Sequence, residues 1–200
     1  MKLIDRILQR WRISKALKYV PAGSRVLDIG CHKGEFFMYA GNRLSSGIGI
    51  DPLLTDSKAA YEPCQFPFSN KIPCPDVTLI KGFFPDDIPP MTKKFDTIII
   101  LAVLEHIPEN MLTNFVSACY NWINDNGRVI LTVPSPFVDN IITVLSKLRL
   151  IDGMSLEEHY GLSIKKVPDF FLKGNYFMLI KHSRFQLGLN NLFVFNKNHP

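Results

Sequence analysis

Residues 25–37, which read RVLDIGCHKGEFF, have the composition of a ligand-binding turn. The apolar run that begins at Val26 predicts a short buried parallel strand, and helical spacing resumes over Glu35–Ala40. Between them, Gly30 and Gly34 bracket a tight turn. Such a strand, turn and helix present backbone N–H groups to a ligand, and glycine keeps side chains out of the ligand's space. Taken alone, the same pattern also fits a plain tight connection.

Asp51 follows a second predicted strand, residues 47–50, and stands 23 positions after Asp28. This is close to the spacing at which an acid after the second strand of a nucleotide-binding fold reaches a ribose. A carboxylate suits that contact because its oxygens can accept hydrogen bonds from both vicinal hydroxyls. A surface acid at a strand end is the alternative interpretation, and the glycine turn upstream favours the ribose contact.

The elements that must position these residues alternate between strands and helices. This alternation predicts an α/β fold with a doubly wound, mostly parallel sheet. Parallel strands are expected at residues 26–29, 47–50, 77–81, 95–101 and 128–133, with a helix at 111–123 and a turn at Asn126-Gly127. Residues 177–184 and 185–196 predict a closing antiparallel pair, with possible interruptions at Gly188, Asn190 and Asn191.

Amphipathic patterns flank this core. Residues 3–18 place Ile7 and Trp11 among apolar positions at helical spacing, with basic side chains between them. Such a helix can lie on an anionic membrane, but packing on its own domain is the favoured interpretation. The remaining predictions are a short helix at 57–61, a proline-rich connection after it, a helix at 137–151 and a short helix within 163–172 broken at Pro168.

The composition is that of one globular domain. The 200 residues are 46% hydrophobic, with a mean hydropathy of +0.07, and no apolar run reaches the about 18 residues of a membrane span. The net charge of +5 is spread along the chain among acids, which favours a solvated surface over nucleic-acid binding. The four cysteines lack zinc-like spacing, so no metal site is predicted, and free thiols indicate a reducing, cytoplasmic location.

Four blocks in order resemble the class I S-adenosylmethionine-dependent methyltransferases, in the broad small-substrate group. They are VLDIGCHKGEF, GIDP, FDTIIILAVLEHIPE and GRVILTVPSP. The resemblance implies a Rossmann-like methyltransferase fold of seven strands, one methyltransferase domain over residues 1–200, and S-adenosylmethionine as the cofactor. Residues 1–20 would form the N-terminal helix, 25–136 the cofactor-binding core, 137–175 a variable substrate-side segment and 176–197 the closing strands.

The resemblance also implies which residues meet the methionine end of the cofactor. Gly30, Cys31 and Gly34 would form the turn against it, and Asp28 would lie below, near the amino group. His32 departs from the commonest pattern, which has a middle glycine at this position.

For the nucleoside end, the resemblance implies that Asp51 holds the ribose hydroxyls and that Phe83 flanks the adenine, its backbone N–H facing the base. Leu101 and Ala102 would lie along the cofactor. Phe83 stands where the family often has an acid that receives the adenine amino group, so a backbone contact is expected in its place.

Methyl transfer is an in-line displacement, so the enzyme must mainly position a nucleophile and exclude water. An oxygen or amine nucleophile must also lose a proton. His106 is the best-placed candidate base, because imidazole titrates near neutrality. A structural histidine that caps the helix after the fourth strand is the favoured alternative. His159 and Tyr160, in the substrate-side segment, rank second as catalytic candidates.

Some classes of methyl acceptor are disfavoured because their motifs are missing. No Asn/Asp-Pro-Pro-aromatic run and no Pro-Cys pair follows the fourth strand, which disfavours amide, exocyclic-amine and pyrimidine-ring methylation. A hydroxyl, amine or carbon on a small molecule, sugar or lipid-linked precursor is the remaining expectation. Two alternatives stay open: an RNA methyltransferase that uses its positive charge, and a non-catalytic partner protein. The glycine turn with Asp51 argues against the second.

Overall fold

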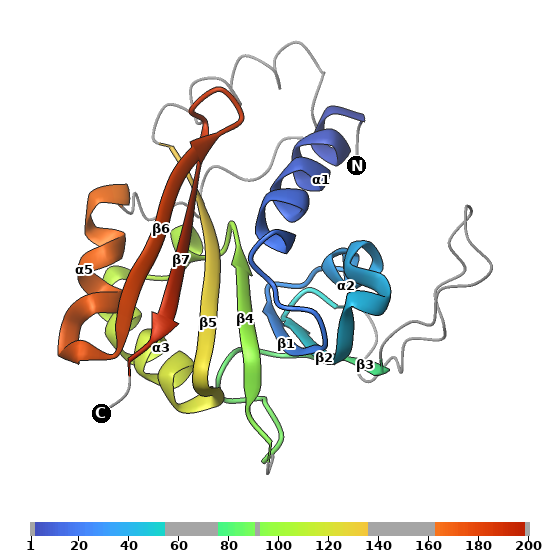
Figure 1. Ribbon diagram of the computed structural model, residues 1–200, viewed down its shortest axis with the longest axis horizontal. Helices are drawn as coiled ribbons and strands as arrows, with labels where there is room; N and C mark the ends of the chain where they lie inside the picture. Colours follow the sequence, from blue (N-terminus) through green and yellow to red (C-terminus); the bar gives the residue numbers. More distant parts are fainter. Residues whose placement is uncertain (1–2, 55–75, 91–92, 136–162, 199–200) are drawn as a thin grey trace.

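The computed structural model describes residues 3–54, 76–90, 93–135 and 163–198. The helices expected at 57–61 and 137–151 lie outside these described residues, as do His159 and Tyr160. The described strands form one seven-stranded sheet in the order β3-β2-β1-β4-β5-β7-β6 (Figure 1). The α/β fold expected from the sequence is therefore confirmed.

The strands are β1 (Ser24–Ile29), β2 (Leu44–Asp51), β3 (Asp76–Lys81), β4 (Phe95–Leu101), β5 (Ile123–Pro134), β6 (Phe177–Phe185) and β7 (Asn190–Lys197). The helices are α1 (Leu3–Leu17), α2 (Glu35–Ala40), α3 (Glu109–Trp122) and α5 (Val167–Leu172). Short 3-10 turns occur at Gly41–Arg43, Leu104–His106, Ile164–Lys166 and Lys173–Asn175. The sequence predicted a break at Pro168, but this residue lies in the first turn of α5. Its missing N–H costs no helical hydrogen bond there, so the helix continues through it.

The sheet changes its winding direction between β1 and β4. Strands β3, β2, β1, β4 and β5 pair in parallel, whereas β7 runs antiparallel to both β5 and β6. Because β1 pairs with β2 on one side and β4 on the other, the carboxyl ends of β1 and β4 border a crevice. Gly30 and Ala102 are the first residues beyond these two strands.

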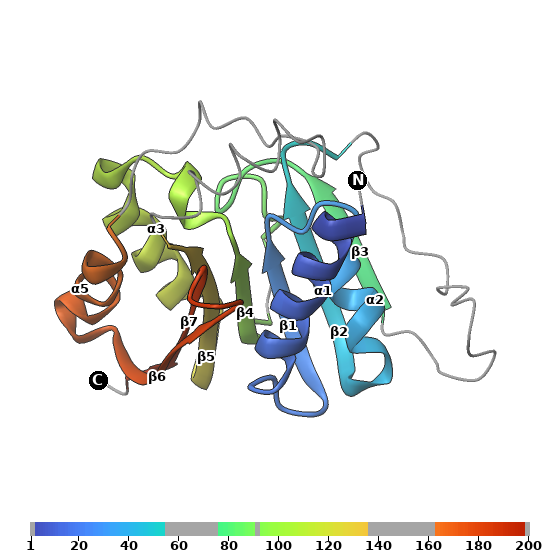
Figure 2. The ribbon, with the colours of Figure 1, turned by 90° about the horizontal axis from the view of Figure 1, so that it is seen from above.

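Two apolar layers cover the faces of the sheet. Figure 2 shows α1 and α2 on one face and α3 and α5 on the other. In β4, Ile98 and Ile100 pack on the α3 and α5 side, whereas Ile99 packs on the α1 and α2 side. This two-sided burial explains the unbroken apolar run in the sequence, since side chains alternate between faces of a strand.

β5 begins five residues earlier than expected, and the Asn126-Gly127 turn becomes an irregularity within it. Ile123 pairs with Phe95, and the register shifts before Arg128 pairs with Thr97. Both Ile123 and Phe95 are fully buried, so pairing them favours extension of the strand. A Cβ atom at Gly127 would lie 2.6 Å from Ile123 Cγ1, which explains the glycine.

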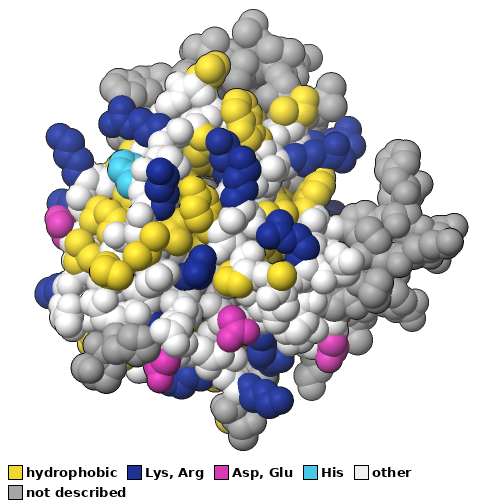
Figure 3. Space-filling model, in the orientation of Figure 1, with side chains coloured by type: hydrophobic (Ala, Val, Ile, Leu, Met, Phe, Trp, Pro, Cys, Tyr) yellow, Lys and Arg dark blue, Asp and Glu magenta, His cyan; other side chains and the backbone are white. Residues whose placement is uncertain are grey.

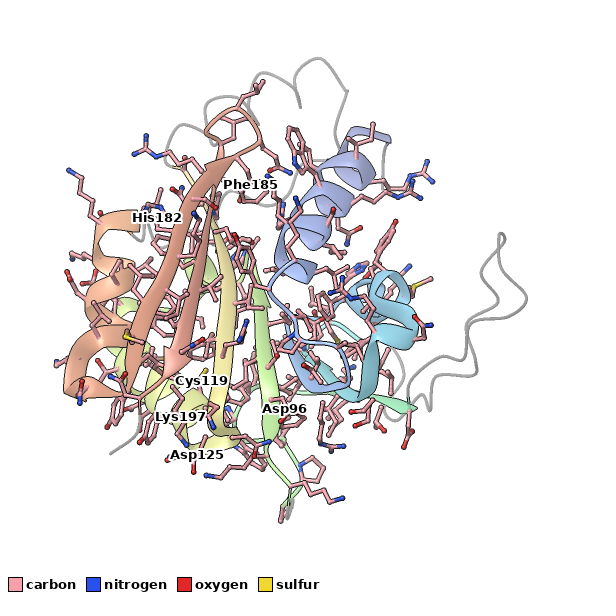
Figure 4. All side chains as sticks on the ribbon, viewed as in Figure 1. Asp96, Cys119, Asp125, His182, Phe185 and Lys197 are labelled. Carbon is pink, nitrogen blue, oxygen red and sulfur yellow. The ribbon has the colours of Figure 1, made fainter. Side chains whose placement is uncertain are left out.

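Lys197 of β7 holds this irregularity in place. Figure 4 shows its side chain beside Asp125, and its Nζ lies 3.0 Å from Asp125 Oδ1. The same Nζ donates to the carbonyl of Ile123 at 3.1 Å and lies 4.5 Å from the centroid of the Tyr120 ring. A buried ammonium that satisfies these groups fixes the start of β5 against the closing strands.

The β6–β7 turn also differs from the expectation. Phe185 ends β6 rather than starting the next strand, because it is buried and pairs with Asn190. Of the expected interruptions, Gly188 lies in the turn. Asn190 and Asn191 lie within β7, where their side-chain amides donate to Gln186 and Ser135. Their buried hydrogen bonds make these asparagines compatible with a strand interior.

Candidate functional site

The turn after β1 is built from left-handed residues tied to β2. Gly30, His32 and Gly34 have φ values of 75°, 49° and 76°. The N–H of Gly30 donates to the carbonyl of Ile50 at 2.8 Å, and the N–H of Gly34 donates to the carbonyl of Cys31 at 2.8 Å. His32 thus adopts a conformation that usually favours glycine, which explains why a middle glycine is common at this position in the family that the sequence resembles.

Gly30 is required by a protein neighbour in addition to any ligand. A Cβ atom at Gly30 would lie 2.4 Å from Cγ2 of Val103, which follows β4. The sequence suggested that glycine keeps ligand space open, but the first clash of a side chain here is with Val103. The two turns that border the crevice are therefore packed directly against each other.

Asp51 connects the carboxyl end of β2 to the glycine turn. Its Oδ2 accepts a hydrogen bond from the N–H of His32 at 2.8 Å, and its Oδ1 accepts one from the N–H of Leu53 at 2.8 Å. The side chain is buried. Each carboxylate oxygen has a second lone pair, so the group is held in place and retains acceptor capacity.

Three carboxylates surround the turn. Burial, followed by the neighbouring carboxylates of Glu35 and Asp51, raises the pKa of Asp28 well above its usual range. His32 Nδ1 lies 2.9 Å from Glu35 Oε1, and Glu35 also accepts from the N–H of Lys33. This environment favours a cation over an anion beside Asp28.

Helix α1 closes one side of this site, which sequence patterns did not reveal. A pocket of about 60 Å³ lies between α1 and the carboxyl ends of β1 and β4. On one side it is lined by Gln9, Arg12 and Ile13 of α1. The residues on the other side come from β1, the turn after it, α2 and the end of β4, and they are Asp28, Gly30, Cys31, His32, Glu35, Phe36 and Leu101. Its size is below the roughly 300 Å³ of a ligand pocket. It therefore suits one end of a ligand rather than the whole molecule.

Arg12 is the functional candidate that the sequence missed. It is partly buried, and its Nε atom is inaccessible to solvent with no hydrogen-bond partner among the described residues. Burial lowers the pKa of Arg12, and the nearby charge of Glu105 opposes this shift. Its only signal in the sequence is an arginine on the helix face between the apolar and exposed sides, which resembles the other basic residues there.

Phe83 lies in the turn after β3, where its backbone N–H has a partner within the protein. Phe83 is 65% exposed, and its backbone N–H donates to Asp87 Oδ2 at 2.8 Å. The N–H that was expected to face an adenine is therefore engaged within the protein. Whether the ring flanks a base stays a prediction, and Asp87 is the acid at this turn.

The end of β4 and the residues after it lie on the other side of the crevice. Leu101 lines the pocket beside Gly30, whereas Ala102 has a φ of 58° and donates its N–H to the carbonyl of Thr132 at 3.0 Å. His106 ends the 3-10 turn, donates its N–H to the carbonyl of Val103 at 2.9 Å and is partly buried. Its role as a base stays a prediction.

The described thiols are structural in character. Cys31 and Cys119 are buried and unpaired with each other. Burial, and at Cys31 the nearby carboxylates, raises the pKa of both thiols, so they remain protonated. In the described part of the chain, no group of metal-ligating side chains forms a metal site and no helix could span a membrane.

Comparison with known proteins shows the family of this chain. The family described as "Methyltransferase domain" matches residues 3–179. The chain belongs to the class I S-adenosylmethionine-dependent methyltransferases. A search of curated proteins finds the mitochondrial ubiquinone biosynthesis O-methyltransferase of Rattus norvegicus, 27% identical over 112 residues. The match covers 56% of this chain but 31% of that relative, so the chain spans about a third of the rat enzyme's length.

Solved methyltransferases share the fold at low identity. The N-methyltransferase NodS from Bradyrhizobium japonicum WM9 has a TM-score of 0.60 and 12% identity, with 98% of this chain and 100% of that one covered. Magnesium protoporphyrin IX methyltransferase from Synechocystis PCC 6803, with bound S-adenosylhomocysteine, has a TM-score of 0.61 and 17% identity, with coverage of 96% and 85%. These likenesses establish the fold.

The residues of the site fit the cofactor of these methyltransferases. S-adenosylmethionine carries a sulfonium and an ammonium, which suit the carboxylates around Asp28, and a carboxylate, which suits the guanidinium of Arg12. Its ribose hydroxyls suit the remaining acceptor capacity of Asp51.

Proposed function

We propose that this protein transfers a methyl group from S-adenosylmethionine to a hydroxyl, amine or carbon of a small molecule, sugar or lipid-linked precursor. The observation that carries the proposal is the contact between Asp51 and the N–H of His32 at 2.8 Å. It joins the turn after β1 to the carboxyl end of β2, next to the point between β1 and β4 where the sheet changes its winding direction and where α/β proteins bind nucleotides.

Two charged groups would orient the methionine end. Asp28 would accept from the ammonium, and Arg12 would pair with the carboxylate from the opposite side of the pocket that they share. A cation beside Asp28 would offset the repulsion from Glu35 and Asp51. Binding would thus satisfy a carboxylate and a guanidinium that are costly to bury alone.

The bound cofactor supplies a methyl group on a positively charged sulfur. The chain's own contribution would be to orient this group and exclude water, because α1 and the end of β4 enclose the pocket near Gly30 and Leu101. His106 would take the acceptor's proton, and His159 and Tyr160 would contact the acceptor.

Titration calorimetry with S-adenosylhomocysteine tests cofactor binding. Asp51→Ala and Arg12→Gln should each lower the affinity about ten- to hundredfold, since each removes charge-assisted hydrogen bonds. Asp76→Ala and Arg6→Gln are matched controls, because both residues are exposed. Asp76 is also the first residue of β3, so it lies at the amino ends of the parallel strands and away from the carboxyl ends that border the site. Equal affinity in Asp51→Ala would remove this residue from the ribose contact, and no binding by the unmodified protein would refute the proposed function.

A labelled methyl group identifies the acceptor class. Protein incubated with methyl-labelled S-adenosylmethionine and separate extracts of lipids, water-soluble small molecules and RNA should transfer label to the lipid or small-molecule extract. Label in RNA alone would replace the proposal by the RNA methyltransferase alternative.

A further inference from the structure

Helix α1 has an apolar outer face in addition to the face that packs on the sheet. Ile13, Ala16 and Leu17 are buried against the domain. Ile7 and Trp11, one turn apart, are 51% and 42% exposed. Residues four apart share a side of a helix, so these two form a continuous apolar strip directed away from the core.

The turn between β6 and β7 exposes another large apolar side chain. Leu187 is 97% exposed, with a φ of 56°, and Gln186 before it has a φ of 52°. Hydrogen bonds from the N–H of Gly188 to the carbonyl of Phe185 and from the Ser135 hydroxyl to the carbonyl of Gly188 hold the turn. The left-handed conformation is unfavourable for leucine, so the fold holds a large apolar side chain in solvent at a conformational cost.

A buried amide joins the turn to the helix. Gln186 is 3% exposed, and its Nε2 donates to the carbonyl of Leu8 at 2.7 Å. Asn190 donates to Gln186 Oε1 at 2.6 Å, which satisfies the acceptor end of the same amide. The turn that carries Leu187 is therefore held beside α1, which carries Ile7 and Trp11. We name these three exposed residues the apolar ridge, and Figure 1 shows α1 and the β6–β7 turn toward the upper end of the molecule.

Basic side chains border the apolar ridge. Arg6 and Arg10 are exposed on α1, and Arg184 is exposed just before the turn. Figure 3 shows Lys and Arg side chains among apolar ones over the upper part of this face, whereas its acidic side chains lie lower. A tryptophan and aliphatic side chains with cationic neighbours match the interface of an anionic bilayer, where acyl chains meet negative head groups.

We propose that the apolar ridge docks the protein on an anionic lipid surface. The ridge lies at the edge toward which the carboxyl ends of β4 and β5 point (Figure 1), and Figure 4 places Phe185, next to the turn, at the same edge. This is also the edge of the cofactor site. Docking would therefore present that edge to lipid-borne molecules, although lipid binding itself requires no methyl transfer.

Vesicle sedimentation tests the docking. The purified protein should sediment with phosphatidylcholine vesicles that contain phosphatidylglycerol, and much less with phosphatidylcholine alone. Leu187→Asn and Trp11→Gln should each lower the partition coefficient about tenfold or more, because each removes a large apolar side chain from the bilayer. Met111→Gln is the matched control, since Met111 is 56% exposed but lies on α3, on the other face of the sheet (Figure 2).

Two further readouts separate docking from structural effects. Leu187→Asn should keep or raise the melting temperature, because asparagine tolerates the left-handed conformation better than leucine. Leu187→Asn and Trp11→Gln should both keep their affinity for S-adenosylhomocysteine. A failed docking proposal can therefore be distinguished from a failed proposal for the function. If both variants retain vesicle binding, the proposal that the apolar ridge docks on lipid is refuted. If the protein forms a dimer through the ridge and binds no vesicles, the partner of the ridge is a second copy of the chain rather than lipid.

Discussion

Replacing Gly30 by alanine should disturb the protein through Val103, and the cost can be resolved into two parts. Gly30 has a φ of +75°, and an added Cβ would lie 2.4 Å from Val103 Cγ2. The left-handed conformation costs alanine about 1–2 kcal/mol, and the overlap adds about 1–3 kcal/mol of overpacking. Gly30→Ala should therefore lower the free energy of unfolding by about 2–5 kcal/mol.

Gly23 supplies a control for the backbone cost alone. Its φ is +76°, but nothing lies within 4 Å of its added Cβ. Gly23→Ala should therefore cost only about 1–2 kcal/mol. In a Val103→Ala background, both Cγ atoms are gone, and the remaining Cβ contact of 3.6 Å at Gly30 is ordinary packing. There, Gly30→Ala should cost as little as Gly23→Ala.

This double-mutant cycle compares four cofactor-free proteins: the unmodified protein, Gly30→Ala, Val103→Ala and the variant with both changes. Urea unfolding measures the stability of each. The coupling between positions 30 and 103 should be about 1–3 kcal/mol and favourable in the double variant. For a chain of this size, each kcal/mol corresponds to about 2–4 °C in melting temperature, so thermal melts give an independent reading. Additive effects at the two positions, or equal costs for Gly30→Ala and Gly23→Ala, would show that Val103 does not limit the turn.

Two predictions concern titratable groups in the site. Because burial raises the pKa of Asp28 in the folded state, its cost is absent below the unfolded value of 3.8 and grows as the pH rises. Asp28→Asn should thus stabilise the cofactor-free protein by about 1–3 kcal/mol at neutral pH, a gain that urea melts should show disappearing on acidification; a gain that persists in acid would contradict this cause. If His106 is the base, His106→Gln should lower kcat about 10²- to 10⁴-fold with unchanged S-adenosylhomocysteine affinity. Unchanged kcat with a lower melting temperature would identify a structural histidine instead.

Local patterns in the sequence were sufficient for the order of elements. The apolar run in β4, the glycines at 30 and 34 and the spacing of Asp51 each depend on neighbours within a few residues or on strand periodicity. These features therefore predicted the α/β class and identified the glycine turn and Asp51 as site candidates. The N–H of His32, which donates to Asp51, belongs to that same predicted turn.

Other features depend on contacts between distant parts of the chain. Arg12 lines the pocket because α1 packs against α2, β4 and β5, and an arginine on an amphipathic helix carries no local sign of that packing. Gln186 joins the β6–β7 turn to Leu8, 178 positions away, which holds the turn of the exposed Leu187 beside α1. The pairing of Ile123 with Phe95 likewise explains why β5 begins earlier than the sequence predicted. Periodicity identifies which face of an element is apolar, but only tertiary packing determines which polar side chains come together, because those contacts join residues that no local pattern relates.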